Sequence, residues 1–505
     1  MEDRTANWWG SKPVLAACVL LSFVPLLLPG IPPLVDLPGH MGRFAVQIDP
    51  EPFKAFYSFH WQAIGNLGVD LLIEPLGRLF GVELGTKLII MTIPPVTVAA
   101  LLWIAREVHG EVPPTAFFAL PLAWGHHFIF GFINFSLSMA LALLAFALWL
   151  RMARLGALKW RPLVFLVISC VVWVAHTVGW GVLGLLCFAA ELYRRRDLGE
   201  GWLTAAIKAA LACLPMALPL LPMLIWRASA TDTTGGWFSV SKKIQWTVTA
   251  LRDRWSTYDI ASVFALLGLL IVAARNPWLV FSRSLGLCAM ILFLAFLVMP
   301  FKIFGSAYAD MRLIPFVIAI AVISIRPIPG ASRALLAVLA ACGLAFFAAR
   351  VTASTISFNR ASVRYDMALQ ALDHVPRGAR VATFVMRRCD LQWSTNRMEH
   401  LAALVMVRRQ GFSNDQWDVE GANLMTVVKS DAPGFAVDAS QMVVPRPCQY
   451  TREWKSLDDS LRLMPRQAFD YVWLIDIPRH DERLTADMQR IWSNGPDQLY
   501  RINHQ

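Results

Sequence analysis

An apolar segment near the start of the chain reads PVLAACVLLSFVPLLLPGIPPLVDLPGH, from Pro13 to His40. Residues 13–35 are long and apolar enough to cross a bilayer, and Asp36 and His40 follow at once. A carboxylate and an imidazole are costly at the mouth of a membrane helix and are often functional there. The segment therefore predicts a first membrane span that ends at a candidate site.

The composition is that of a polytopic membrane protein. Of the 505 residues, 56% are hydrophobic and only 16% are charged, and the mean hydropathy is +0.51. A soluble domain of this size has no interior large enough to bury so much apolar surface. Apolar runs of about 20 residues, the length of a transmembrane helix, recur as far as Arg350. We therefore predict a polytopic α-helical membrane domain over residues 1–351.

The apolar runs predict about eleven transmembrane helices. Two segments are too long for one span and indicate tight helical hairpins: 115–150, with its tip at Trp124 to His127, and 162–193, with His176 near its tip. Single spans are expected at 13–35, 84–105, 203–227, 258–275, 279–300, 311–325 and 334–351. An odd number of spans places the two termini on opposite sides of the membrane.

Basic loops indicate the orientation, because cytoplasmic loops are enriched in Lys and Arg. Three such loops are Arg151 to Arg161, Arg194 to Arg196, and the pair Arg326 and Arg333. They predict a cytoplasmic N-terminus in an inner (plasma) membrane, with Asp36 and the C-terminal region outside. Topology thus accounts for much of the net charge of +11, and we expect no nucleic-acid partner.

One loop runs against this topology. Residues 228–256 carry Lys242, Lys243, Arg252 and Arg254 although they are placed outside. Either these charges belong to an anion-binding site, or the number of spans is wrong.

Residues 352–505 have the polar and charged content of a soluble domain. Their periodicity predicts strands at 378–385 and 470–477 and helices at 362–374 and 398–409, which indicates a small periplasmic α/β domain. The region contains no glycine-rich phosphate loop, zinc-binding cysteine cluster or nucleophile elbow. Its two cysteines, Cys389 and Cys448, either form a disulfide or remain free thiols.

Asp36 has two interpretations. Beside low-dielectric helix ends its carboxylate would have a raised pKa and serve as a general base, with Pro38 and Gly39 turning the chain to hold it off the helix. Alternatively, Asp36 caps the helix that Gly39 and His40 open.

Charged residues flank the start of a later span. They are Lys302, Asp310 and Arg312, and an arginine at this depth must be paired or face a polar cavity. One interpretation is that Arg312, helped by Lys302, grips a phosphate, for which a guanidinium fork has suitable geometry and charge. The other is a local pair between Asp310 and Arg312 with snorkelling at the interface.

Five histidines are predicted on the same outer side as Asp36, namely His40, His60, His126, His127 and His176. His126 and His127 are adjacent, and adjacent side chains on a helix point apart. No spacing typical of a metal site occurs, so we expect no metal and no other cofactor. The histidines are expected to donate hydrogen bonds in a cavity or to lie in the membrane interface.

The combination of these features resembles the GT-C superfamily of membrane glycosyltransferases. The shared features are an acidic residue directly after the first span (Asp36), many spans, a charged element entering a late span (Asp310-Met311-Arg312) and an extracytoplasmic tail. In this resemblance Asp36 matches the catalytic carboxylate and Arg312 a ligand of the carrier phosphate. The chain departs from the family pattern in two ways. Family members often have a second acidic residue close to the first, whereas here the nearest later carboxylates are Asp49 and Glu51. The chain also has no W-W-D-type signature, which is typical of oligosaccharyltransferases.

The resemblance implies transfer of a sugar from a polyprenyl-phosphate donor to a glycan, lipid or protein acceptor. Asp36 would be the base with His40 as its helper, Arg312, Lys302 and Asp310 would lie at the donor phosphate, and His60, His126, His127 and His176 would line the cavity. In the tail, an acceptor surface or a structural role remains open for Trp393, Arg397, Glu399, His400 and Trp417. A flippase of lipid-linked glycans and a non-catalytic assembly factor are the alternatives.

Overall fold

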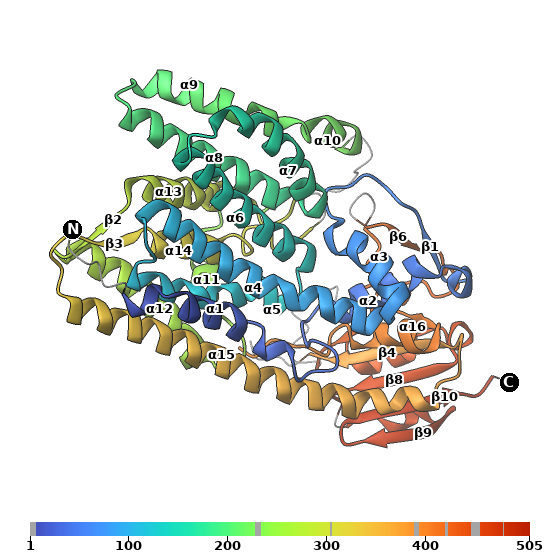
Figure 1. The fold of residues 1–505 in the computed structure, drawn as a ribbon. Coiled ribbons are helices and arrows are strands. Elements are labelled where there is room, and N and C mark those ends of the chain that lie inside the picture. The colour runs from blue at the N-terminus through green and yellow to red at the C-terminus, as the bar shows by residue number, and fades with distance from the viewer. Residues whose placement is uncertain are drawn as a thin grey trace.

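The computed structural model describes residues 7–227, 234–303, 306–387, 393–419, 423–445, 455–477 and 479–504. It consists of a long helical body with a sheet-containing region at one end, which holds the C-terminus (Figure 1). Cys389 and Cys448 lie outside the described residues.

Helices make up most of the described chain (Figure 1). In chain order they are α1 (Lys12–Leu21), α2 (Leu37–Ile48), α3 (Gly68–Phe80), α4 (Val82–His109), α5 (His126–Phe130), α6 (Ile133–Arg154), α7 (Arg161–Ala175), α8 (Thr177–Asp197), α9 (Trp202–Cys213), α10 (Leu220–Arg227), α11 (Val240–Val248), α12 (Ser256–Arg275), α13 (Arg283–Val298), α14 (Ile314–Ile323), α15 (Arg333–Leu369), α16 (Leu404–Arg409) and α17 (Leu457–Leu463).

The protein is embedded in a membrane. Five helical stretches in the described chain are long and apolar enough to span a bilayer: Val82–His109, Ile133–Arg154, Leu158–Ala175, Ser256–Arg275 and Arg333–His374. Shorter apolar helices cover Lys12–Leu26, Trp202–Ala217, Arg283–Val298 and Ile314–Ile323. The total of eleven spans stays a prediction, because several of these helices are shorter than about 20 residues.

Of the two predicted hairpins, only the second packs as one: α7 contacts α8, whereas the 3-10 helix of the first packs mainly on α15, α14 and α4. A 3-10 helix, Pro114–Trp124, leads through the short α5 into α6, so that His126 and His127 lie at the turn. In the second segment α7 runs directly into α8, and His176 separates the two helices.

Two of the expected spans are shorter than predicted. Residues 279–281 form strand β2 (Leu279–Phe281), which pairs antiparallel with β3 (Ile325–Pro327). This pair of strands links the segment before α13 to the segment after α14. The spans expected at 279–300 and 311–325 therefore each lose residues to a strand.

The predicted basic loops lie together at one end of the helical body. Glu107, near the end of α4, pairs with Arg151 and Arg154 at the end of α6. Glu191 in α8 pairs with Arg161 at the start of α7. Further contacts at this end are those of His109 with the carbonyl of Ile323 and of Asn7 with Glu111. The sheet region lies at the opposite end (Figure 1).

Helix α15 connects the two parts of the molecule. It runs without interruption from Arg333 to Leu369 and so passes through the predicted boundary between residues 351 and 352. Its 37 residues at about 1.5 Å per residue exceed the thickness of a hydrocarbon core. The helix therefore carries the chain out of the membrane and into the sheet region as one rod.

The C-terminal region contains a mixed six-stranded sheet in the order β5-β4-β8-β10-β9, with β7 beside β4. Strand β4 pairs parallel with β5, β7 and β8, and β10 pairs antiparallel with β8 and β9. The strands are β4 (Arg380–Met386), β5 (Phe412–Ser413), β7 (Met442–Val443), β8 (Tyr471–Ile475), β9 (Met488–Asn494) and β10 (Asp497–Ile502). β8 lies within its predicted segment and β4 overlaps its own except for Met386, because fully buried strands read as continuous apolar runs.

The segment that follows Asp36 packs against this C-terminal region. Helix α2 contacts α16 and the short 3-10 helix Leu401–Ala403. Strand β1 (Tyr57–Phe59) pairs antiparallel with β6 (Met425–Val427). Side chains of this early segment share a hydrophobic core with β4 and β8. Residues 37–59 thus pack against the C-terminal region close to Asp36.

Candidate functional site

A cavity of about 1560 Å³ lies between the helical body and the C-terminal region. Its walls come from α2, from the turns at α5 and between α7 and α8, from the turn before α14, from α15 and from loops of the C-terminal region. Of the residues predicted from sequence, Asp36, His40, His126, His176 and Arg312 line it.

The backbone around Asp36 is fixed by the turn at α5. The amide of Asp36 donates to the carbonyl of Phe130 at 2.9 Å. Gly131, with φ of +102°, packs so closely that a Cβ there would lie 2.8 Å from the Asp36 nitrogen. The Asp36 side chain makes no capping hydrogen bond to α2, so the helix-cap interpretation is wrong. The carboxylate faces the cavity instead.

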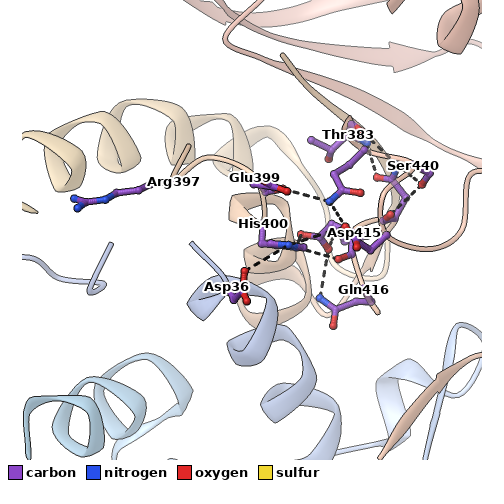
Figure 2. Close-up of polar contacts among 12 residues, drawn as sticks. Asp36, Thr383, Arg397, Glu399, His400, Asp415, Gln416 and Ser440 are labelled. Atoms are coloured by element: carbon purple, nitrogen blue, oxygen red, sulfur yellow. Dashed lines mark hydrogen bonds and ion pairs between the residues drawn. The ribbon is translucent and has the colours of Figure 1, made fainter. Parts of the chain in front are cut away.

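The electrostatic surroundings of Asp36 come mostly from the C-terminal region. Figure 2 shows the carboxylate pointing toward His400, whose Nε2 lies 4.0 Å from Asp36 Oδ1. Burial raises the pKa of Asp36 to about 7, His400 and Arg312 oppose that rise, and Glu399 and Asp438 add to it. Asp36 therefore titrates in the range where a carboxylate is an effective general base.

His40 lies one helical turn beyond Asp36 and lines the same cavity. Its ring lies 5.2 Å from that of Trp417, which approaches so closely because Gly39 has no side chain. Burial, together with the charges of Arg43, His400 and Arg312, holds the pKa of His40 well below its usual range. A neutral imidazole at this place is suited to hydrogen-bond a hydroxyl group.

Arg312 lies in the turn before α14, and only 8% of its surface is exposed. Its Nη2 donates to Ser306 Oγ at 3.0 Å and to the carbonyl of Ala307 at 2.9 Å. The guanidinium stacks over Phe132 at 3.7 Å from the ring centre. Arg312 makes no ion pair with any described residue, so a buried positive charge faces the cavity without a carboxylate partner.

The alternative of a local pair between Asp310 and Arg312 is wrong. Asp310 accepts from Lys243 Nζ at 2.8 Å, and the same ammonium donates to the carbonyl of Met299 at 2.6 Å. Lys243 belongs to the basic loop that runs against the predicted topology. Its charge is used inside the fold, and this leaves Arg312 available.

The other predicted site residues lie apart from the cavity. Lys302 forms a backbone bridge with Gly235 and is not among the lining residues. His60 is exposed on the loop after β1. His127 packs between Phe135 and Phe316, while its neighbour His126 faces the cavity and contacts the carbonyl of Arg252 at 3.3 Å.

His176 has a structural contact in addition to its place in the cavity wall. Its Nδ1 accepts from the amide of Val178 at 3.1 Å and so caps α8. In the described residues no group of three or more His, Cys, Asp or Glu side chains is arranged to hold a metal ion.

The C-terminal region contributes further residues to the site. Glu399, His400 and Trp417, for which the sequence left an acceptor surface or a structural role open, line the cavity. Asp438, which the sequence did not single out, lines it too, and Asp415 lies behind His400. Glu399 and Asp438 supply the acidic neighbours that the sequence around Asp36 lacks. The sequence signal was the polar run from Ser413 to Gln416, which begins at the last residue of β5; in the structure all four residues are buried.

The cavity wall is rich in arginine. The lining arginines are Arg43, Arg252, Arg254, Arg312, Arg360, Arg364, Arg387 and Arg397. Arg43, Arg364 and Arg397 pair with Asp70, Asp497 and Asp253, respectively. The cavity therefore suits a negatively charged substrate group.

Gly131 offers a test of how Asp36 is positioned. Gly131→Ala is expected to lower stability by about 1–2 kcal/mol, because alanine at positive φ is strained, and to displace Asp36, whose backbone the new Cβ would meet. The measurements are thermal unfolding and the activity tested below. Gly110→Ala is the matched control, since Gly110 has φ of +83° and nothing within 4 Å of a Cβ. Equal loss of activity in both variants would contradict the positioning role.

Comparison with known proteins identifies the fold. The crystal structure of ArnT from Cupriavidus metallidurans in the apo state matches with a TM-score of 0.51, over 97% of this chain and 98% of that one, at 12% identity. The structure of the same protein bound to undecaprenyl phosphate matches with a TM-score of 0.49 at 14% identity and the same coverage. ArnT is a GT-C glycosyltransferase, and this chain shares its fold. Neither a family model nor a curated protein sequence matches the chain.

Proposed function

We propose that the protein is a glycosyltransferase that moves a sugar from a polyprenyl-phosphate donor to a glycan, lipid or protein acceptor outside the cytoplasm. The observation that carries this proposal is that Asp36 and Arg312 line one cavity. The cavity thus combines a carboxylate whose pKa burial raises to about 7 with a buried guanidinium that has no carboxylate partner among the described residues. The GT-C fold supports the same function.

The reaction needs a base and a stabilised leaving group. Asp36 accepts the proton of an acceptor hydroxyl as that oxygen attacks the anomeric carbon of the donor sugar. The bond between that carbon and the phosphate oxygen breaks, and polyprenyl phosphate leaves with the electron pair. Arg312 stabilises the negative charge on the departing phosphate. Attack from the face opposite the phosphate inverts the anomeric centre.

The neighbouring residues take supporting roles. His40 hydrogen-bonds the acceptor, and His126 and His176 shape the cavity wall. Lys302 and Asp310 are given no role at the phosphate, because neither side chain lines the cavity. No step in this scheme requires a metal.

The site is proposed to open outside the cytoplasm, in an inner membrane crossed about eleven times. The support is the position of the basic loops, which lie at the end of the helical body opposite the sheet region. The N-terminus is then cytoplasmic, and residues 352–505 form a periplasmic domain. The phosphate and the acceptor meet on that side.

Donor consumption by the purified protein tests this function. The protein in lipid nanodiscs is incubated with undecaprenyl phosphate linked to radiolabelled glucose, mannose or xylose and with an extract of envelope lipids and glycans. We expect release of undecaprenyl phosphate and transfer of label to a component of the extract with at least one donor. Movement of intact donors across proteoliposome membranes without any release would instead identify a flippase. Neither release nor movement would favour an assembly factor.

A further inference from the structure

His400 lies at the centre of a group of carboxylates. Its side chain is 3% exposed. Nε2 lies 4.0 Å from Asp36 Oδ1 and 4.0 Å from Asp438 Oδ1, and Nδ1 lies 4.0 Å from Asp415 Oδ2. In Figure 2 the imidazole lies between Asp36 and Asp415. Such a position is electrostatically favourable only for an imidazolium.

The orientation of the ring is fixed by its other nitrogen. Nδ1 lies 3.2 Å from the carbonyl oxygen of Asp415, which can only accept, so Nδ1 carries a hydrogen. In a neutral ring Nε2 would then direct a lone pair at the carboxylates of Asp36 and Asp438. A second proton on Nε2 converts that repulsion into attraction. Burial alone lowers the pKa of His400, but Asp438, Asp36, Asp415 and Glu399 outweigh it and raise the pKa.

The carboxylates around His400 are themselves held in place. Ser413 Oγ donates to Asp415 Oδ1 at 2.8 Å, and Gln441 Nε2 donates to Asp438 Oδ1 at 2.7 Å. The ring of Trp417 packs against His400 with 4.5 Å between ring centres. The C-terminal region therefore presents His400 to Asp36 on a prebuilt support.

Other charged groups face this pair from both parts of the molecule. On the helical side the charge of Arg312 lowers the pKa of Asp36. The charges of Arg43 and Arg312 lower the pKa of the neighbouring His40. On the C-terminal side the charge of Arg387 lowers the pKa of Glu399. Among the groups that act on Asp36, His400 is the largest influence that favours the ionised form.

We propose that His400 is a positioning residue for the transfer reaction, an imidazolium that orients the Asp36 carboxylate and keeps it ionised before the acceptor arrives. The inference rests on the proposed function of Asp36 as base. His400 keeps its proton throughout, while Asp36 takes the proton of the acceptor and releases it to water after the product leaves. The proposed base, Asp36, thus depends on His400, a residue of the C-terminal region.

The ionisation of Asp36 can be measured without any transfer activity. Dicyclohexylcarbodiimide reacts with protonated carboxyl groups in apolar surroundings, and mass spectrometry of the peptide containing Asp36 gives the extent of labelling at each pH. For the full chain in nanodiscs we expect labelling to fall as the pH rises, with a midpoint at about 7. In His400→Gln the positive charge is lost, and the midpoint should rise by about one pH unit or more. An unchanged midpoint in a folded variant overturns the proposal.

Two further variants complete the test. His480→Gln is the matched control, since His480 is a half-buried histidine of the same region that contacts Tyr500 rather than Asp36; its midpoint should equal that of the wild type. Asp438→Asn removes a carboxylate that raises the pKa of Asp36, so its midpoint should fall. If His400→Gln does not fold, His400→Asn carries the same test, because it also removes the positive charge; an unchanged midpoint in that variant overturns the proposal.

Transfer activity separates this inference from the proposed function. With a donor that the wild type consumes, His400→Gln should shift the acidic limb of kcat/KM to higher pH by the same amount as the labelling midpoint. A purely structural role would lower the rate at every pH and leave that limb in place. If Asp36→Asn retains full transfer, the proposed base is wrong whatever His400 does. If Asp36→Asn is inactive and the limb does not move in His400→Gln, only the role of His400 is wrong.

Discussion

Asp36→Asn is expected to lower sugar transfer by about 10²–10⁴-fold, the usual contribution of a general base. The amide has nearly the same shape as the carboxylate but cannot accept the acceptor proton. Because Asp36 makes no capping hydrogen bond to α2, the substitution removes no contact on which the helix depends. The loss should therefore appear in kcat, with thermal stability and affinity for undecaprenyl phosphate close to those of the wild type.

Asp49→Asn is the matched control for this experiment. Asp49 follows the last residue of the same helix and is exposed, so its neutralisation should leave transfer unchanged. Initial rates with a saturating radiolabelled donor provide the measurement. Full activity of Asp36→Asn in correctly folded protein would show that Asp36 is not the base.

Arg312→Gln is expected to weaken binding of undecaprenyl phosphate by about 10–100-fold, as for the loss of a charge-assisted contact of about 1.5–3 kcal/mol. The guanidinium faces the cavity without a carboxylate partner among the described residues, so a ligand phosphate is its natural counter-charge. Arg312→Lys keeps the charge but not the fork geometry, and a smaller loss is expected. Equilibrium binding of radiolabelled undecaprenyl phosphate to the protein in nanodiscs measures both.

Arg326→Gln is the control for Arg312. Arg326 lies just beyond the other end of α14 and is exposed among the basic loops. Its removal takes away the same charge at the opposite end of the helix, and binding of the carrier should not change. Equal affinity of Arg312→Gln and wild type would place the carrier phosphate elsewhere in the cavity.

The sequence predicted much of the helical body, because the cost of polar groups in a membrane makes apolar runs and basic loops readable. The same cost made Asp36 and Arg312 conspicuous, and both line the cavity. His126 and His127 show the limit of this reasoning. Adjacent residues on a short helix point in different directions, and the sequence could not decide which of the two faces the cavity.

The C-terminal half of the site was not predictable in the same way. His400, Asp415 and Asp438 belong to loops with ordinary polar composition, and charged residues in soluble loops are usually solvated. Their importance arises from the packing of α2 on α16 and from the pairing of β1 with β6. Both contacts join segments more than 300 positions apart, and no local pattern encodes them. Lys302 was conspicuous for the same reason as Arg312, but it is not among the residues that line the cavity, and its backbone forms a bridge with Gly235.

The packing of α2 onto the C-terminal region also has a consequence for biosynthesis. Asp36 is translated before His400 and Asp438, which lie more than 360 positions later in the sequence. A nascent or truncated chain therefore holds an isolated carboxylate and an open cavity. Under the proposed function, a lipid-linked sugar would therefore meet the complete site only after both parts of the chain have been made and have packed together.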